Sequence, residues 1–261
     1  MGLAALGRRL ARWRDERALR RHAIPGPLWD AVVAAYPFIA RRGVDDRADL
    51  RRLCSLFLAR KEFHGAQGLT VTDEMAVAIA AQACLPILRL GIDAYDGFVG
   101  IVVHPDEVVA PRETMDEDGV VHAYDETLTG EAMDGGPVML AWADVLAAGD
   151  TAEMAYNVVI HEFAHVLDMA DGVADGVPLL PTAAARDAWI ACLDVEYERF
   201  AARVEADDEA TLLDPYGAEG PEEFFAVAAE AFFVAPQGLR GEHPALYGLL
   251  ASYFRQDPAA R

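Results

Sequence analysis

Apolar residues recur at helical spacing in the second half of the chain and mark out two long helices. The first is an apolar run that follows Asp150-Thr151-Ala152-Glu153, a sequence typical of a capping box at a helix start. Its apolar members are Val158, Val159, Ile160, Phe163, Ala164, Val166 and Leu167. The second helix is predicted between Pro221, which suits a first helical turn, and Pro236, which ends it. Both helices are apolar enough to be buried.

Short apolar runs before these helices predict strands. They cover residues 99–104, 120–124 and 137–142, with a turn at 117–119. Residues 75–92 are also rich in apolar side chains, but Gln82 and Pro86 interrupt them, so a buried helix is predicted and not a membrane span. The pattern therefore predicts an α+β fold. Helices occupy roughly the first 95 residues, a small mixed sheet follows to about residue 142, and helices complete the chain.

The composition is typical of one compact enzyme of the cytosol. The chain has 261 residues, of which 53% are hydrophobic, so it can bury a substantial core. Cys54, Cys84 and Cys192 are an odd number without close pairing, which makes a disulfide framework unexpected. The apolar start, residues 1–6, is too short for a signal peptide. We therefore expect a cytoplasmic protein with no integral membrane segment.

Charge divides the chain into a basic start and an acidic body. Residues 1–61 hold 14 of the 22 basic side chains and 6 of the 43 acidic ones, while the net charge of the whole chain is −21. The acidic body is expected to repel nucleic acid. Arginines at seven positions in residues 1–24 form a helix-compatible arm with Leu and Trp. We expect this arm either to dock on the body or to contact a membrane surface or an acidic partner.

The sequence His161-Glu162-Phe163-Ala164-His165 lies within the first apolar helix. Residues four apart share one face of a helix, so both imidazoles can reach one metal ion while Glu162 lies beside its open position. This arrangement is typical of zinc peptidases. The alternative is a pair of histidines satisfied within the core, because unpaired buried polar groups are costly.

A catalytic zinc ion needs a third protein ligand in addition to two histidines. One candidate is Asp171, six residues after His165, but that geometry needs a turn-forming residue where the chain has Asp168. A more distant carboxylate from the second predicted helix fits better. Glu223 and Glu230 lie seven residues apart on one face of that helix.

The residues from Tyr216 to Glu223, with Phe224-Phe225-Ala226 after them, resemble the third-ligand segment of the Mlc titration factor A family of zinc peptidases. Residues 84–91, 95–98, 136–142 and 165–169 resemble segments of the same family in the same order, within a resemblance that spans roughly residues 47–258. The chain is also distantly similar to the catalytic domain of anthrax lethal factor, a gluzincin, where a tyrosine precedes the ligand glutamate by seven residues. The resemblance implies a zincin-like fold.

The resemblance implies a role for each matching residue. His161, His165 and Glu223 would bind Zn2+, Glu162 would act as general base, and the Tyr216 phenol would stabilise the oxyanion. Tyr216 has a plainer alternative as a half-buried loop aromatic. Outside the ligand set, Asp168 or Glu230 is expected to orient an imidazole, with a local cap and an exposed helix position as their alternatives.

The strand predicted just before the active helix is expected to bind substrate. In the zinc peptidases that the chain resembles, this strand is the sheet edge along which an extended peptide pairs. The candidate substrate-binding residues are Pro137, Val138, Met139, Leu140, Ala141 and Trp142. The alternative is a buried core strand.

These features predict a zinc-dependent peptidase, and the resemblance implies aminopeptidase-like action on short peptides and, in some members, association with a transcriptional repressor. The alternative is a regulatory, partner-binding protein in which the zinc site is secondary. Hydrolysis of a non-peptide amide is a third possibility, because the zinc chemistry is the same. The expected organisation is a basic arm at 1–24, a helical part at 25–95 and a catalytic part at 96–261.

Overall fold

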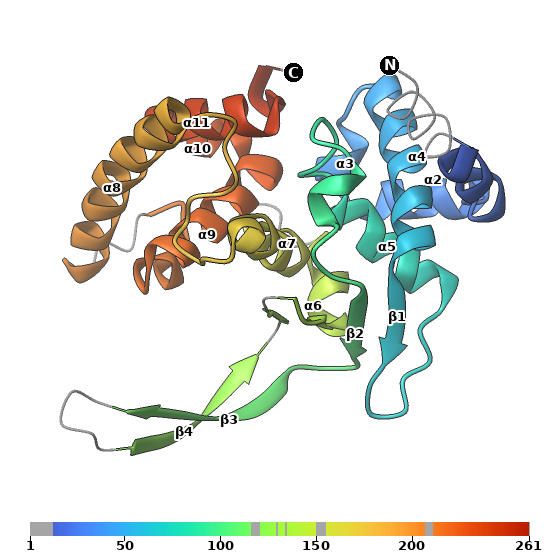
Figure 1. Ribbon diagram of the computed structural model, residues 1–261, viewed down its shortest axis with the longest axis horizontal. Coiled ribbons are helices and arrows are strands. Elements are labelled where there is room, and N and C mark those ends of the chain that lie inside the picture. Colours follow the sequence, from blue (N-terminus) through green and yellow to red (C-terminus); the bar gives the residue numbers. More distant parts are fainter. Residues whose placement is uncertain are drawn as a thin grey trace, which may run out of the picture.

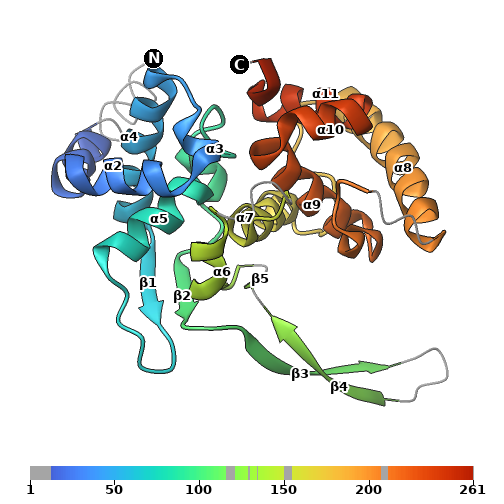
Figure 2. The ribbon, with the colours of Figure 1, turned by 180° about the vertical axis from the view of Figure 1, so that it is seen from behind.

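Two helical parts lie on either side of a central helix in the computed structural model of the protein, with a small sheet beside it (Figure 1). The structure describes residues 13–115, 121–128, 130–133, 135–149, 155–206 and 211–260. The central helix is α7 (Val158–Asp168), and the helices that precede and follow it in the chain lie on opposite sides of it (Figure 2). The predicted α+β class is confirmed.

The N-terminal part is helical, as predicted, but it also contributes a strand. Its helical segments are residues 13–21, α2 (Gly26–Ala35), α3 (Pro37–Ala40), α4 (Val44–Arg60), α5 (Asp73–Ala83) and the 3-10 helix η1 (Ile92–Tyr95). The Thr72 hydroxyl accepts the N–H of Met75 at 3.3 Å and thereby caps α5. Strand β1 (Glu62–Gly65) interrupts the region predicted as helical.

The described part of the N-terminal arm contacts the body of the protein. Ala18 and Leu19 pack against the hydrophobic core, and the Asp15 carboxylate lies 3.5 Å from the Arg60 guanidinium of α4. Residues 1–12, which hold three of the seven arginines, lie outside the described residues. No described helix is long and apolar enough to cross a membrane.

The mixed sheet has four strands in the order β1-β2-β6-β5, with β2 (Gly100–His104), β6 (Val138–Ala141) and β5 (Gly130–Ala132). β1, β2 and β6 run parallel, and β5 runs antiparallel to β6. The strand predicted at 120–124 corresponds to the start of β4 (Val121–Leu128), which pairs with β3 (Val108–Met115) in a separate hairpin that extends away from the sheet (Figure 1). The turn predicted at 117–119 lies outside the described residues.

Helices make up most of the chain after the sheet. They are α6 (Trp142–Ala147), α7, η3 (Met169–Asp171), α8 (Ala183–Glu205), η4 (Pro215–Ala218), α9 (Pro221–Val234), α10 (Pro236–Glu242), α11 (Pro244–Phe254) and η5 (Pro258–Ala260). The prediction of a helix between Pro221 and Pro236 is confirmed by α9. Pro236 ends α9 and opens α10, because a proline at the first helical turn lacks only an N–H that would be unpaired there.

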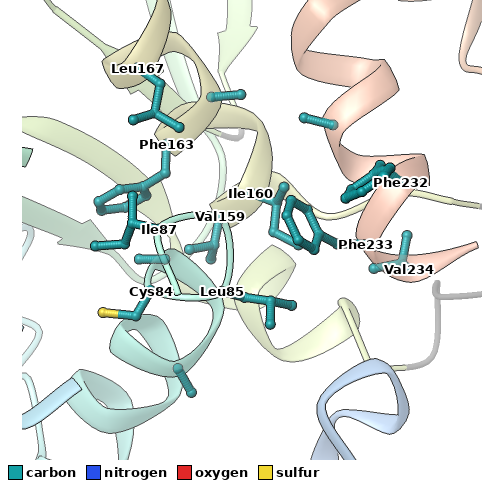
Figure 3. Packing of buried hydrophobic residues seen from close by; sticks show 14 of the residues in the cluster. Cys84, Leu85, Ile87, Val159, Ile160, Phe163, Leu167, Phe232, Phe233 and Val234 are labelled. Carbon is teal, nitrogen blue, oxygen red and sulfur yellow. The ribbon is translucent and has the colours of Figure 1, made fainter. Parts of the chain in front are cut away.

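The hydrophobic core surrounds α7. Its side chains Val159, Ile160, Phe163 and Leu167 lie between the segment after α5 and the aromatic side chains of α9 (Figure 3). The Phe163 ring packs 5.0 Å from the ring of Tyr95, measured between centroids. Because α7 is packed on both sides, its remaining polar face is held in a fixed direction, and the two histidines lie on that face.

Candidate active site

The active helix α7 begins at an asparagine cap. The Asn157 side chain accepts the N–H of Ile160 at 2.9 Å, and its amide nitrogen donates to Gln82 of α5 at 2.8 Å. The capping box predicted at 150–153 lies outside the described residues, but the prediction that α7 continues from it is wrong, because residues 155–157 precede α7 in non-helical conformations. Asn157 therefore anchors the start of α7 to the N-terminal part of the protein.

His161 and His165 lie one helical turn apart, with ring centroids separated by 4.8 Å. Their Nε2 atoms are 3.1 Å apart. The carboxylate of Glu223 reaches both rings from the first turn of α9, with its Oε2 3.1 Å from Nε2 of His161 and 3.3 Å from Nε2 of His165. These three atoms form a nearly equilateral triangle.

The triangle has the dimensions of a zinc site. Three N and O ligands at about 2.0–2.1 Å from a tetrahedral ion are themselves about 3.3 Å apart. Two imidazoles and one carboxylate are also the donor set of catalytic zinc sites that keep a fourth position for water. Among the residues that the structure describes, His161, His165 and Glu223 are the one group of three or more such side chains placed to hold a metal. Asp171 is not part of it.

Glu230 contacts the other side of the first imidazole. Its Oε1 lies 2.8 Å from Nδ1 of His161, and its Oε2 accepts the backbone N–H of Asn157. A carboxylate at Nδ1 keeps the proton on that nitrogen and leaves Nε2 free to bind a metal. Of the two predicted roles, the structure therefore places Glu230 against an imidazole and not on an exposed helix face.

Glu162 lies in the same cavity but outside the triangle of ligands. Burial raises the pKa of this carboxyl to about 7, opposed by the two imidazoles and supported by the charge of Glu223. The backbone of Gly130 in β5 passes so close that a Cβ atom at this position would lie 2.5 Å from Oε1 of Glu162. A larger residue at this position would force the Glu162 side chain or the strand to shift, and no local pattern in the sequence indicates this close approach.

The cavity has a volume of about 310 Å³. Strand β5 forms one wall, α7 another, and the side chains of Tyr216, Glu222 and Glu223 a third. The Tyr216 ring lies 6.0 Å from the His161 ring between centroids, and its side chain is 42% exposed. Asp214 accepts the N–H of Tyr216 at 2.9 Å and shapes the short helix η4 that carries it. Tyr216 is thus placed at the cavity and not elsewhere on the surface.

The model of one protein family, the glucose-regulated metallopeptidase M90 family, matches residues 10–255. The chain is 36% identical to Mlc titration factor A of Edwardsiella ictaluri over 95% of its own length and 94% of the relative's. It is also 36% identical to Mlc titration factor A of Pectobacterium atrosepticum, over 89% of this chain and 87% of the relative, and to an uncharacterized protein of Synechocystis sp., over 94% and 89%. The chain belongs to the M90 family. The predicted family is confirmed.

The charges of this M90 site favour a cation between the three ligands. Burial disfavours charge on His161, but its hydrogen bonds to Glu223 and Glu230 outweigh burial and raise its pKa. Burial likewise opposes charge on Glu223, yet hydrogen bonds to His161 and His165 lower the pKa of Glu223 to about 2. The Glu223 carboxylate is therefore ionised at neutral pH. Either a divalent cation or protonated imidazoles can balance its negative charge, because a metal ion displaces the protons from its ligands.

The predicted substrate strand is not at the edge of the sheet. β6, which holds Val138 to Ala141, pairs with β2 on one side and with β5 on the other, so its backbone groups are occupied. Pro137 precedes this strand and Trp142 begins α6. The prediction of an edge at 137–142 is wrong because β5 pairs with the side of β6 that β2 leaves open. The strand beside the candidate metal site of this M90 protein is β5.

Asp168 hydrogen-bonds to the loop after α7, and no hydrogen bond between Asp168 and an imidazole is found among the described residues. Its Oδ2 accepts the N–H of Gly176 at 2.9 Å, and the carbonyl of Gly176 accepts the indole N–H of Trp189 at 2.8 Å. A Cβ atom at Gly176 would lie 2.4 Å from the carbonyl oxygen of Pro221. Asp168 thus ties the end of α7 to the loop that packs under the start of α9, which carries Glu223. This is the local role that the sequence left open.

The family match also changes the interpretation of the N-terminal arm. The resemblance noticed in the sequence begins at about residue 47, whereas the M90 match begins at residue 10. The helix at 13–21 is therefore part of the family's common region and not an addition to it.

Proposed function

We propose that this chain is a zinc-dependent peptidase. The observation that carries the proposal is the triangle of His161, His165 and Glu223, whose ligating atoms lie 3.1–3.3 Å apart in a cavity that also holds Glu162. A zinc ion bound there supplies a Lewis acid and lowers the pKa of water toward neutrality. Membership of a metallopeptidase family supports the same reading.

The residues of the chain divide the remaining work. Glu162 takes a proton from the attacking water and returns it to the leaving amine, for which a carboxyl whose pKa lies near 7 is well matched. Tyr216 lies on the cavity wall, where its phenol is placed to donate a hydrogen bond to the oxyanion as the carbonyl becomes tetrahedral. Glu230 keeps His161 in one tautomer. The edge of β5 aligns the peptide.

For short peptides we propose aminopeptidase-like action, as the family resemblance implies. The cavity wall carries the carboxylates of Glu131 and Glu222 in addition to the ligand Glu223. A carboxylate at this place neutralises the α-ammonium group of a peptide whose first bond lies at the metal centre.

The test combines metal analysis with turnover of a mixed peptide library, with and without chelator. We expect about one zinc per chain and hydrolysis that chelation abolishes and zinc restores. Glu162→Gln should keep the zinc and lose hydrolysis by roughly 10²–10⁴-fold. Glu198→Gln, an exposed glutamate of α8 outside the cavity, is the matched control and should keep most of the activity. Full activity of Glu162→Gln would refute the assignment of Glu162 as general base. Hydrolysis of simple amides but not of peptides would show that the substrate is a non-peptide amide.

A second candidate function follows from the names of the relatives. Several curated relatives are named Mlc titration factor A, which indicates binding of the repressor Mlc by those proteins. We propose that this chain also binds a repressor of that type, through a surface that does not depend on hydrolysis. Purified Mlc should bind Glu162→Gln and the unaltered protein with equal affinity. Absence of binding by both would restrict repressor binding to the relatives.

A further inference from the structure

A second cavity lies next to the metal-site cavity. It has a volume of about 490 Å³, and its walls are mainly apolar. The lining includes Leu90, Phe98, Met133, Leu167, Leu179 and Tyr253. Met169 lines both this apolar cavity and the metal-site cavity, so the two adjoin.

The chain passes from the metal-site cavity to the apolar cavity at two places, at the end of β5 and along α7. Gly130 to Ala132 of β5 line the metal-site cavity, and Met133, the next residue, lines the apolar cavity. Along α7, His161, Glu162 and His165 line the first cavity, and Val166 and Leu167 line the second. A peptide that lies along β5 past the metal centre therefore reaches the apolar cavity.

The direction of that peptide follows from the position of β5 at the end of the strand order. One side of β5 is paired antiparallel with β6, and no described strand pairs with its other side. Antiparallel pairing is slightly the more stable. A peptide antiparallel to β5 runs from the Met133 end toward the Gly130 end, where Glu162 lies. The apolar cavity thus faces residues on the N-terminal side of the scissile bond.

The distance along β5 sets which residue of the peptide reaches the cavity. Gly130 and Met133 are three residues apart, which is about 10 Å in an extended chain. The side chain that fills the apolar cavity therefore belongs to a residue two or three positions before the scissile bond. An aminopeptidase substrate, with one residue before the bond, does not extend this far.

The walls of the cavity favour an apolar side chain. Phe98 is 5% exposed, and the Lys61 ammonium lies 3.6 Å from its ring centroid while donating to the carbonyl oxygens of Tyr95 and Phe98 at 2.5 Å. The carboxylates at the rim, Asp93 and Asp96, lie 2.6 Å and 3.1 Å from the Arg60 guanidinium. Their charge is partly balanced, so no cationic ligand is required, and the wall around Phe98 is held in place before a ligand arrives.

We propose that the apolar cavity is a substrate subsite that binds a large apolar side chain two or three residues before the scissile bond, and that the protein therefore cleaves longer peptides within the chain. This inference rests on the proposed peptidase function. It extends that function by naming the substrate class and the position that is recognised.

The test uses soluble Ala/Ser/Thr peptides blocked at both ends, each with one Phe, and matched peptides with Gly in its place. We expect cleavage two or three residues after Phe, with kcat/KM at least about tenfold above that of the Gly peptide. Ala170→Trp and Ala94→Trp, which each place a large side chain in the lining of the cavity, should abolish this preference and leave the Gly peptide cleaved at a similar rate. Ala245→Trp, an exposed alanine of α11 outside both cavities, is the control and should keep the preference.

Binding separates failure of the subsite from failure of the proposed function. With Glu162→Gln, the Phe peptide should bind at least about tenfold more tightly than the Gly peptide, and Ala170→Trp in the same background should remove the difference. Equal affinities, or cleavage only on the N-terminal side of Phe, would overturn the subsite. Selective binding without hydrolysis by the zinc-loaded, unaltered protein would retain the subsite and refute the peptidase function.

Discussion

Two glutamates of α9, two helical turns apart, contact the imidazole of His161 from opposite sides. Glu223, in the first turn, reaches Nε2 of His161 at 3.1 Å and keeps 18% of its side chain exposed to the cavity. Glu230 reaches Nδ1 at 2.8 Å and is 3% exposed. One helix thus supplies both a candidate metal ligand and the group that orients another ligand.

The two glutamates also differ in their affinity for a proton. Hydrogen bonds to two imidazoles overcome the effect of burial and lower the pKa of Glu223 to about 2. For Glu230, burial is the larger effect, and it raises the pKa although His161 and the N–H of Asn157 oppose the change. The number of charged partners around a buried carboxylate, and not the residue type, determines whether it is ready to bind a cation.

The largest test of this difference is the loss of the exposed glutamate. Loss of a residue that hydrogen-bonds a metal ligand typically weakens metal binding by about 10–100-fold. Glu223→Ala removes one of the three ligands itself, so it should weaken zinc binding by more than about a hundredfold. Zinc affinity measured by competition with a chelator checks this. Glu222→Ala, in the same helical turn, should leave the affinity close to that of the unaltered protein. An equal loss in both variants would contradict the ligand assignment.

A third carboxylate in the cavity, Glu162, makes the free energy of unfolding depend on pH. Its pKa in the folded protein is about 7, above the ordinary 4.5, so the folded state binds its proton more tightly than the unfolded state. Stability is therefore lost as pH rises from about 4.5 through 7. In the chelated protein, Glu162→Gln removes this loss and should be more stable above pH 7 by on the order of 3 kcal/mol, with little difference near pH 4.

Urea unfolding of the two chelated proteins across this pH range measures that difference. The comparison between variants isolates Glu162, because the other ionisable groups are present in both. A constant difference at all pH values would show that burial does not raise the pKa of this carboxyl.

The approach of β5 to Glu162 offers a smaller test on the opposite wall of the cavity. Gly130→Ala adds a Cβ atom that would lie only 2.5 Å from Oε1 of Glu162, so the carboxylate or the strand must move. A displacement of this size should lower kcat/KM by about a hundredfold while zinc binding persists. Gly248→Ala, where a Cβ atom meets nothing within 4 Å, is the control. Unchanged kcat/KM in Gly130→Ala would separate β5 from the catalytic geometry.

The smallest expected effect concerns the buried glutamate of α9. Glu230→Gln keeps the size of the side chain but removes the charge beside Nδ1 of His161, and it should weaken zinc binding by about 10–100-fold. Chelator competition measures this loss as well. If Glu230→Gln weakened zinc binding more than Glu223→Ala, the roles of the two glutamates would be reversed.

Local patterns in the sequence were enough to predict the elements that carry the site. His161 and His165 are one turn apart on any α-helix, so their shared face follows from spacing alone. Pro221 and Pro236 delimit α9 because proline constrains its own backbone and that of the preceding residue. The start of α7 was predicted wrongly because a capping box upstream competes with Asn157, whose amide also bonds Gln82 of α5.

Spacing within the sequence was enough to predict the shared face of His161 and His165, the place of the candidate base Glu162 beside them, and the second helix that carries Glu223 and Glu230. The family resemblance had already indicated Glu223 as the third ligand, but only the tertiary structure shows its carboxylate within reach of both imidazoles, because Glu223 meets His161 across 62 residues of chain. It also decided that β5 and not β6 is the edge strand, because strand order depends on which backbone groups pair. The closeness of Gly130 to Glu162 arises from that same packing, which no local pattern records.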